Sequence, residues 1–137
     1  MIFMLKAEGR VYTLGDRIGL TTRYVKDIEV LRNAITSDTV PLVSTFDQPL
    51  GAWNLTQPIG RAELEIRGDS IYAKLTFNEQ SSDIYKDALD NGYNAKLGFH
   101  AVRCDVKDDI VNSMSIIACG VSDTCLGGVL EGIRNED

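Results

Sequence analysis

The stretch RAELEIRGDSIYAKLTF, residues 61–77, constrains the fold more than any other part of the chain. Apolar and polar residues alternate on both sides of the pair Gly68–Asp69, and alternation with period two is typical of strands that have one buried and one solvated face. A Gly-Asp pair between two such runs indicates a tight turn. The apolar positions are Ala62, Leu64 and Ile66 in the first arm and Ile71, Ala73, Leu75 and Phe77 in the second. The sequence therefore predicts a β-hairpin.

More strands are expected on both sides of this hairpin, because short runs of apolar and β-branched residues end at Gly, Pro or Asp. The first two of them are separated by a break at Gly9, and the last two are joined by the polar turn KDD. The proline- and glycine-rich segment 48–60 reads as a loop. The predicted strands are 2–8, 10–14, 41–46, 94–106 and 110–119.

Two helices are predicted from apolar residues spaced three and four apart. The first covers 21–38, with Thr22 as its cap and an apolar face made of Val25, Ile28, Leu31 and Ile35. The second covers 79–93, with Ser81 or Ser82 as its cap and an end at Gly92. Its expected inner stripe consists of Ile84, Tyr85, Ala88 and Leu89.

Many strands with two or three helices, in an order that is not βαβ throughout, indicate a mainly β fold of the α+β class. We expect a β-barrel or sandwich with helices packed at its edges. The length of 137 residues suits a single domain, 1–137. The segment 121–137 is acidic at its end and is expected to be a frayed or partner-bound tail.

Charge and composition exclude several classes of function. The formal net charge is −6 and the basic residues are scattered, so nucleic acid is not expected as a partner. No apolar run approaches the roughly 20 residues that span a bilayer, and we expect neither a membrane partner nor a secretory signal. Three cysteines without C-x-x-C spacing and a single histidine predict free thiols, no metal site and no cofactor.

The order of several short motifs resembles the capsid maturation (prohead) proteases of tailed phages, which share their fold with the herpesvirus assemblins. The motifs are VPLVSTFDQPLG, QPIGRAELEIRGDSIYAKLTF and SSDIYKDALDNGYNAKLGF, and the resemblance covers residues 7–120. It implies a closed or partly open β-barrel of the prohead-protease type. The activity of that family is serine proteolysis, with a serine nucleophile and a histidine base.

Neither of these two catalytic residues is present where the resemblance places it. The family's histidine falls on Phe46, beside Asp47, and its serine falls on Lys96 in NAKLGF. Phenylalanine cannot accept a proton, and lysine has no hydroxyl with which to form an acyl intermediate. We therefore expect no catalytic residue at these degenerate positions.

Two alternatives would restore a catalytic site. A lysine can activate a serine, so Lys96 could pair with Ser113 or Ser115 of a neighbouring strand. The alternation NSMSII favours a simpler interpretation, in which both serines face solvent. His100 lies just past the motif, but a lone histidine beside Phe99 is more often a packed residue than a base.

Four apolar residues are candidates for binding. Trp53, in the loop GAWNLTQP, is either a core plug or an anchor at an interface. Val129, Leu130 and Ile133 follow the pair Gly127–Gly128 and could become buried only on a partner. Without such a partner they would form a terminal extension.

These observations lead to an expected function and two rivals. We expect a non-catalytic structural protein of a virus head, a capsid decoration or cement protein that binds the major capsid protein or other head proteins and self-associates on the capsid lattice. It would lie in the virion, and in the host cytoplasm during assembly. The first rival is an active capsid maturation serine protease with a displaced Ser-Lys dyad. The second is a non-viral β-barrel binding protein.

Overall fold

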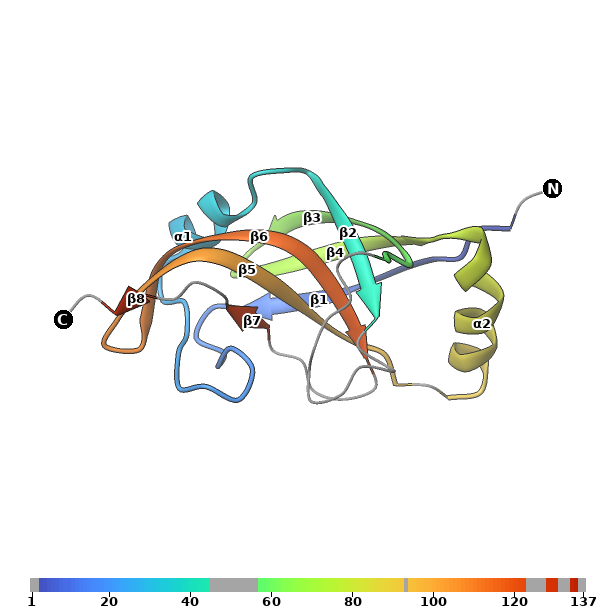
Figure 1. The fold of residues 1–137 in the computed structure, drawn as a ribbon. Coiled ribbons are helices and arrows are strands. Elements are labelled where there is room, and N and C mark those ends of the chain that lie inside the picture. The colour runs from blue at the N-terminus through green and yellow to red at the C-terminus, as the bar shows by residue number, and fades with distance from the viewer. Residues whose placement is uncertain (1–2, 45–56, 93, 123–127, 131–133, 136–137) are drawn as a thin grey trace.

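The computed structural model describes residues 3–44, 57–92, 94–122, 128–130 and 134–135 (Figure 1). Within them the strands form one curled sheet, and two helices pack at its ends. The order in the sheet is β1-β4-β3-β2-β6-β5-β7, with β8 also paired to β5. The elements are β1 (Lys6–Thr13), α1 (Ile28–Ala34), β2 (Thr39–Ser44), β3 (Gly60–Arg67), β4 (Ser70–Phe77), α2 (Glu79–Asp90), β5 (Lys96–Lys107), β6 (Ile110–Ser122), β7 (Val129–Leu130) and β8 (Arg134–Asn135). The prediction of a mainly β chain with two helices is confirmed.

The predicted hairpin at 61–77 is confirmed as β3 and β4, which pair from Gly60↔Phe77 to Arg67↔Ser70. Gly68 has a φ of 62°, which the tight turn requires. Gly60 has a separate role, because a Cβ placed there would lie 2.2 Å from the carbonyl oxygen of Thr76. The glycine of the IGR motif therefore allows the two strands to approach closely at the start of the hairpin.

The second hairpin, β5 and β6, is also confirmed. Its two turn residues, Asp108 and Asp109, both have positive φ, at 52° and 65°, as a two-residue turn of type I′ demands. β6 continues to Ser122, past the predicted end at residue 119, and its last part pairs in parallel with β2 through Leu42↔Cys119. This parallel pair joins the two hairpins into one sheet (Figure 1).

The predicted break at Gly9 is wrong. β1 runs without interruption past Gly9, which pairs with Ala73 of β4. The absence of a side chain at Gly9 leaves room for Leu97 of β5, because a Cβ at this position would lie 2.8 Å from Cδ1 of Leu97. Gly9 thus marks the point where the first strand meets a strand from the other end of the curl.

The first helix is shorter than predicted. It begins at Ile28, and Asp27 is its cap, because the Oδ1 atom of Asp27 accepts a hydrogen bond from the backbone N–H of Glu29 at 3.0 Å. Thr22 is therefore not the cap. Val25 is buried but lies outside the helix, where the hydroxyl of Tyr12 binds its backbone N–H. Tertiary contacts hold this segment in a non-helical path.

The second helix begins at the predicted residue, Glu79, but it ends at Asp90, before the predicted residue 93, and its cap and its inner face differ. Asn78 precedes it, and Ser82 is fully buried inside it, where its Oγ atom accepts a hydrogen bond from the backbone N–H of Leu5 at 2.8 Å. Ser81 and Ser82 are therefore not caps. Ile84 does not belong to the inner stripe, because its side chain is 68% exposed. The predicted end at Gly92 is confirmed, with a φ of 89°.

The core lies in the hollow of the curled sheet. Its largest fully buried side chains come from both hairpins, from α1 and from the segment before α1, and include Phe77, Phe99, Ile18, Leu31 and Ile116. The rings of Tyr12 and Phe99 meet edge to face, with centroids 5.7 Å apart. This contact packs β1 against β5, although the two strands share no ladder of hydrogen bonds within the described residues.

Candidate functional site

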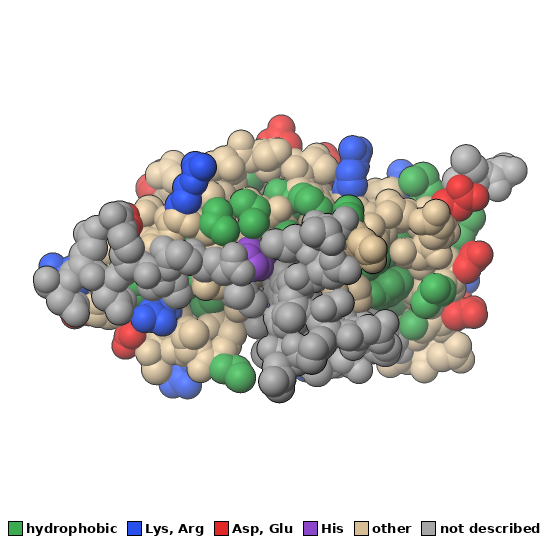
Figure 2. All heavy atoms as spheres, in the orientation of Figure 1, with side chains coloured by type: hydrophobic (Ala, Val, Ile, Leu, Met, Phe, Trp, Pro, Cys, Tyr) green, Lys and Arg blue, Asp and Glu red, His purple; other side chains and the backbone are tan. Residues whose placement is uncertain are grey.

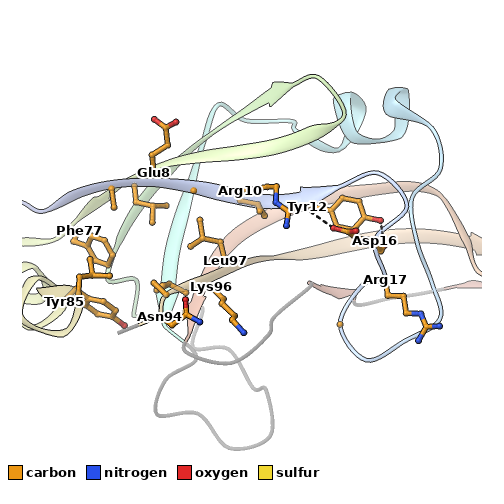
Figure 3. A pocket seen from close by; sticks show the side chains of 18 residues that line it. Glu8, Arg10, Tyr12, Asp16, Arg17, Phe77, Tyr85, Asn94, Lys96 and Leu97 are labelled. Carbon is orange, nitrogen blue, oxygen red and sulfur yellow. Dashed lines mark hydrogen bonds and ion pairs between the residues drawn. The ribbon is translucent and has the colours of Figure 1, made fainter. Parts of the chain in front are cut away.

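A groove of about 810 Å³ opens where the curled sheet stays unclosed, between β1 and the start of β5 (Figure 3). We call it the β1–β5 groove. Its volume lies within the range of about 300 to 1,000 Å³ that ligand pockets occupy. The described residues that line it are Ala7, Glu8, Gly9, Arg10, Val11, Tyr12, Asp16, Arg17, Gly19, Leu75, Phe77, Tyr85, Leu89, Asn94, Ala95, Lys96, Leu97 and Val121.

One end of the groove is apolar and is built by α2 against β4. The rings of Phe77 and Tyr85 lie 4.8 Å apart, and Leu89 follows Tyr85 by one helical turn. The hydroxyl of Tyr85 forms a hydrogen bond of 2.8 Å with Oγ of Ser44 in β2, which fixes its orientation. Figure 2 shows apolar side chains at the surface beside α2, with acidic side chains along the outer end of the molecule.

The other end of the groove is polar and is built around Tyr12. The Tyr12 hydroxyl donates to the carbonyl oxygen of Asp16 at 2.5 Å, which holds the loop after β1 against the strand. Arg10 pairs with the carboxylate of Asp16 at 3.5 Å. Arg17 and Lys96 also line the groove, one from the loop and one from the first position of β5 (Figure 3).

Glu8 lines the groove from β1 but turns its carboxylate away from it, toward Arg67 of β3 (Figure 3). The hydrogen bond from Arg67 holds the pKa of Glu8 below its ordinary value. Arg67 also contacts Glu65 and lies over the ring of Tyr72 at 4.7 Å. The charge of Glu8 is therefore already engaged outside the groove.

The structure separates Lys96 from the serines proposed as its partners. Along β5 and β6, Lys96 lies opposite Ser122, whereas Ser115 lies opposite Val102 and Ser113 lies opposite Asp105. Ser122 lies seven positions after Ser115 in β6, which corresponds to roughly 23 Å of strand. Ser113 is exposed, as predicted from the alternation, and its Oγ atom donates to Oδ2 of Asp105 at 3.2 Å.

Ser122 is the residue that faces Lys96 across the hairpin, but its side chain is only 2% exposed. A nucleophile must be reachable by the carbonyl it attacks. His100 is likewise buried, at 3% exposure, and lies opposite Ala118 of β6 and Val129 of β7. The structure therefore does not bring Lys96, Ser113, Ser115 and His100 together at one open site.

The remaining candidates fall in two groups. Phe46, Asp47, Trp53 and Ile133 lie outside the described residues. Val129 and Leu130 form β7, which pairs in parallel with His100 and Ala101 of β5. The backbone of Gly128, just before β7, lies so close to the ring of Phe99 that a Cβ there would be 2.7 Å from Cε1 of the ring.

The described thiols do not contribute to the groove. Cys104 and Cys119 are buried thiols that form no disulfide within the described residues, as predicted, and burial raises the pKa of Cys119 to about 12. Cys125 lies outside the described residues. Among the described side chains, no group of three His, Cys, Asp or Glu is arranged to hold a metal ion. No helix in the same part of the chain is long and apolar enough to cross a membrane.

The chemistry of the groove is that of binding. Its described lining contains no serine, threonine, cysteine or histidine. It offers the edge of β1, apolar side chains at one end, Lys96 in its middle part and Arg17 at the other end (Figure 3). Lys96 was predictable as a candidate from its motif, whereas Arg17 and the edge of β1 were not, because Arg17 stands in a turn-rich segment with no periodic pattern.

Comparison of the chain with protein-family models, with curated proteins and with solved structures finds no significant match. The resemblance to the prohead proteases thus rests on the order of the motifs in the sequence.

Proposed function

We propose that the protein is a non-catalytic structural protein of a virus head, a capsid decoration or cement protein that binds the major capsid protein. The motif order supports the proposal, and so does the coarse architecture, a mainly β chain whose curled sheet forms half of a barrel. The chain uses its glycines and hairpins to maintain this scaffold. Many copies on a symmetric lattice would combine weak individual contacts into strong overall binding.

The proposal that the protein is not a protease depends on two residues, the one at position 96 and the one that pairs with it across the β5–β6 hairpin. The position that the resemblance assigns to the nucleophile holds a lysine, and the residue opposite it, Ser122, is buried. The described lining offers no hydroxyl other than the phenols of Tyr12 and Tyr85. Burial raises the pKa of Tyr12 to about 12, so its phenolate is not available near neutral pH.

A labelling experiment tests this part. The protein is incubated with a fluorophosphonate probe and, separately, with the candidate major capsid protein from the same genome. We expect neither labelling nor cleavage. Labelling that is lost in Ser113→Ala, Ser115→Ala or Ser122→Ala would establish the rival, an active serine protease that uses a Ser-Lys dyad.

Binding to heads is tested by co-sedimentation. The protein is mixed with heads assembled from that major capsid protein, and the pellet is quantified against protein concentration. We expect saturable binding with many copies for each head. Absence of the protein from the pellet at all concentrations would reject the capsid-binding function and favour a β-barrel binding protein of another system.

A further inference from the structure

We propose that the β1–β5 groove binds an extended peptide segment of a partner protein. The segment adds a strand to the free edge of β1, and acidic side chains of the segment contact Arg17 and Lys96. The proposal goes beyond binding to a capsid, since it names the recognition mode and the chemistry of the bound segment. It rests on the groove alone and holds whether or not the partner is a capsid protein.

The lining of the groove indicates that it follows the edge of β1. Six consecutive residues, 7–12, contribute to the lining. Successive side chains of a strand point to opposite faces, so a pocket on one face would be lined by every second residue. The register of β1 shifts between Arg10 and Tyr12, but residues 7–10, before this irregularity, alternate regularly and all four line the groove. The groove therefore runs along the edge of β1, where backbone N–H and C=O groups are presented.

This edge of β1 has no partner within the described residues. β1 stands at the end of the sheet order and pairs only with β4. An unpaired edge beside a groove is the arrangement to which proteins add an extended peptide as a further strand. Six residues at about 3.3 Å each give an edge of roughly 20 Å, which matches a peptide of about six residues.

The charges of the groove select an acidic segment. Arg10, Arg17 and Lys96 supply three positive charges, and Glu8 and Asp16 supply two negative ones. Glu8 is engaged by Arg67 outside the groove, and Asp16 is engaged by Arg10. Arg17 and Lys96 have no ion-pair partner in the described part of the chain. They are two cationic side chains of one groove, Lys96 near its middle and Arg17 at its far end (Figure 3), in a protein of formal charge −6.

The apolar end supplies the second element of recognition. Phe77 of β4 and Tyr85 of α2 lie at this end, beside the N-terminal half of β1 (Figure 3), and Leu89 of α2 also lines the groove. A peptide on the β1 edge would place an apolar side chain at this end and acidic side chains at the end near Arg17. Backbone pairing gives affinity in this mode, and the two ends give specificity.

Nuclear magnetic resonance of the ¹⁵N-labelled full chain tests the inference at peptide concentrations up to millimolar. The probes are the capped hexapeptide Leu-Thr-Val-Thr-Glu-Asp and its reversed sequence, because a strand can add in either direction. We expect at least one of them to shift the backbone amide signals of residues 7–12 and of Lys96 and Leu97. A peptide with Lys-Lys in place of Glu-Asp should bind about tenfold more weakly, as expected for the loss of charge-assisted contacts.

Charge-reversal variants inside and outside the groove separate recognition by the groove from non-specific electrostatic attraction between the peptide and the protein. Lys96→Glu and Arg17→Glu should each weaken binding of the acidic peptide about tenfold. Lys107→Glu makes the same change of charge at the opposite end of β5, where the side chain is exposed and outside the groove, and should change the affinity less than twofold. All three positions are exposed or in a loop, and circular dichroism verifies that each variant is folded.

A peptide whose alternate backbone nitrogens are methylated keeps its side chains but cannot pair with a strand edge, and it should not bind. The inference is overturned if neither hexapeptide shifts the signals of β1 at millimolar concentration, or if the methylated peptide binds equally well. It is also overturned if Lys96→Glu and Lys107→Glu have equal effects. None of these outcomes bears on binding to heads, which the co-sedimentation measures separately.

Discussion

The phenol oxygen of Tyr12 accepts a hydrogen bond from the backbone N–H of Val25 at 2.9 Å. The same hydroxyl donates to the carbonyl oxygen of Asp16, so one side chain of β1 holds both ends of the segment that leads to α1. Tyr12 is 2% exposed and Val25 is fully buried. Tyr12 lies at the polar end of the groove, and its bond to Val25, together with the backbone bonds of Val25 to Gly15 and of Tyr24 to Asp109 and Val111, explains why the chain is not helical before Ile28.

Replacing Tyr12 with phenylalanine should destabilise the protein. The ring would keep its contact with Phe99, but the buried N–H of Val25 would lose its partner, at a cost of about 1–3 kcal/mol. Urea denaturation followed by circular dichroism measures the change. Tyr72→Phe is the matched control, because Tyr72 is half-buried and its hydroxyl has no hydrogen-bond partner among the described residues, so we expect a change within about 0.5 kcal/mol. Equal stability of Tyr12→Phe and Tyr72→Phe would contradict the role of the hydroxyl.

Stability should fall as the pH rises from about 10 to 12. Burial raises the pKa of Tyr12 to about 12 from its ordinary value of 10.0, so the folded state favours the neutral phenol. A raised pKa in the folded state contributes stability below the unfolded pKa, and this contribution disappears as the pH passes through the folded pKa. Cys119, with its pKa raised to about 12 from 9.0, acts in the same direction.

The difference between the wild-type protein and Tyr12→Phe isolates the phenol. Their free energies of unfolding, measured by urea denaturation at pH 8, 10, 11 and 12, should converge as the pH rises. A constant difference across this interval would show that the phenol does not titrate with folding.

Local signals predicted the two hairpins correctly, because alternation and turn residues are properties of neighbouring positions. The end of α2 at Gly92 was predictable for the same reason. The start of α1 was not, since residues 21–27 are held by Tyr12 from another element. Ser82 has the residue type of a cap, yet its hydroxyl binds the backbone of Leu5 in a segment 77 positions away. Long-range contacts decided each of these cases.

In the candidate site too, local sequence signals were predictable and long-range contacts were not. Lys96 could be singled out from its motif, but the register that places it opposite Ser122 depends on bulges between His100 and Val106. The groove could not be found in the sequence, because it joins the edge of β1 to residues 94–97 through the curl of the sheet. Gly9 suggested a broken strand and is instead the point of contact with Leu97.

Gly60→Ala should be strongly destabilising. The added methyl group would meet the carbonyl oxygen of Thr76 at 2.2 Å, and backbone atoms on both sides cannot yield without breaking the β3–β4 ladder. We expect a loss of about 3 kcal/mol, at the upper end of overpacking effects. Thermal and urea denaturation measure it. Arg61→Ala, at the next and exposed position, serves as the control and should cost much less. If Gly60→Ala lowers the free energy of unfolding by less than about 1 kcal/mol, the backbones of β3 and β4 can separate at this position and the close approach of Gly60 to Thr76 is not required.

Ser82→Ala should detach α2 from the start of the chain, while Ser81→Ala should not. The Ser82 hydroxyl accepts from the N–H of Leu5 at 2.8 Å and contacts the carbonyl oxygen of Asn78 at 2.8 Å, and the side chain is fully buried. Removing it leaves the Leu5 N–H without its acceptor, which costs about 1–3 kcal/mol. Ser81, its neighbour, is half-buried, and its hydroxyl forms no such bond within the described part of the chain.

Hydrogen exchange distinguishes local detachment from general loss of stability. In Ser82→Ala the amide of Leu5 should exchange faster by a larger factor than the amides of the β5–β6 hairpin, because the lost bond ties only the chain before β1 to α2. In Ser81→Ala both sets of amides should exchange as in the wild-type protein. A uniform increase across the sheet in Ser82→Ala would instead mean that α2 and the sheet unfold as one unit. The apolar end of the groove would then depend on the whole fold and not on this bond.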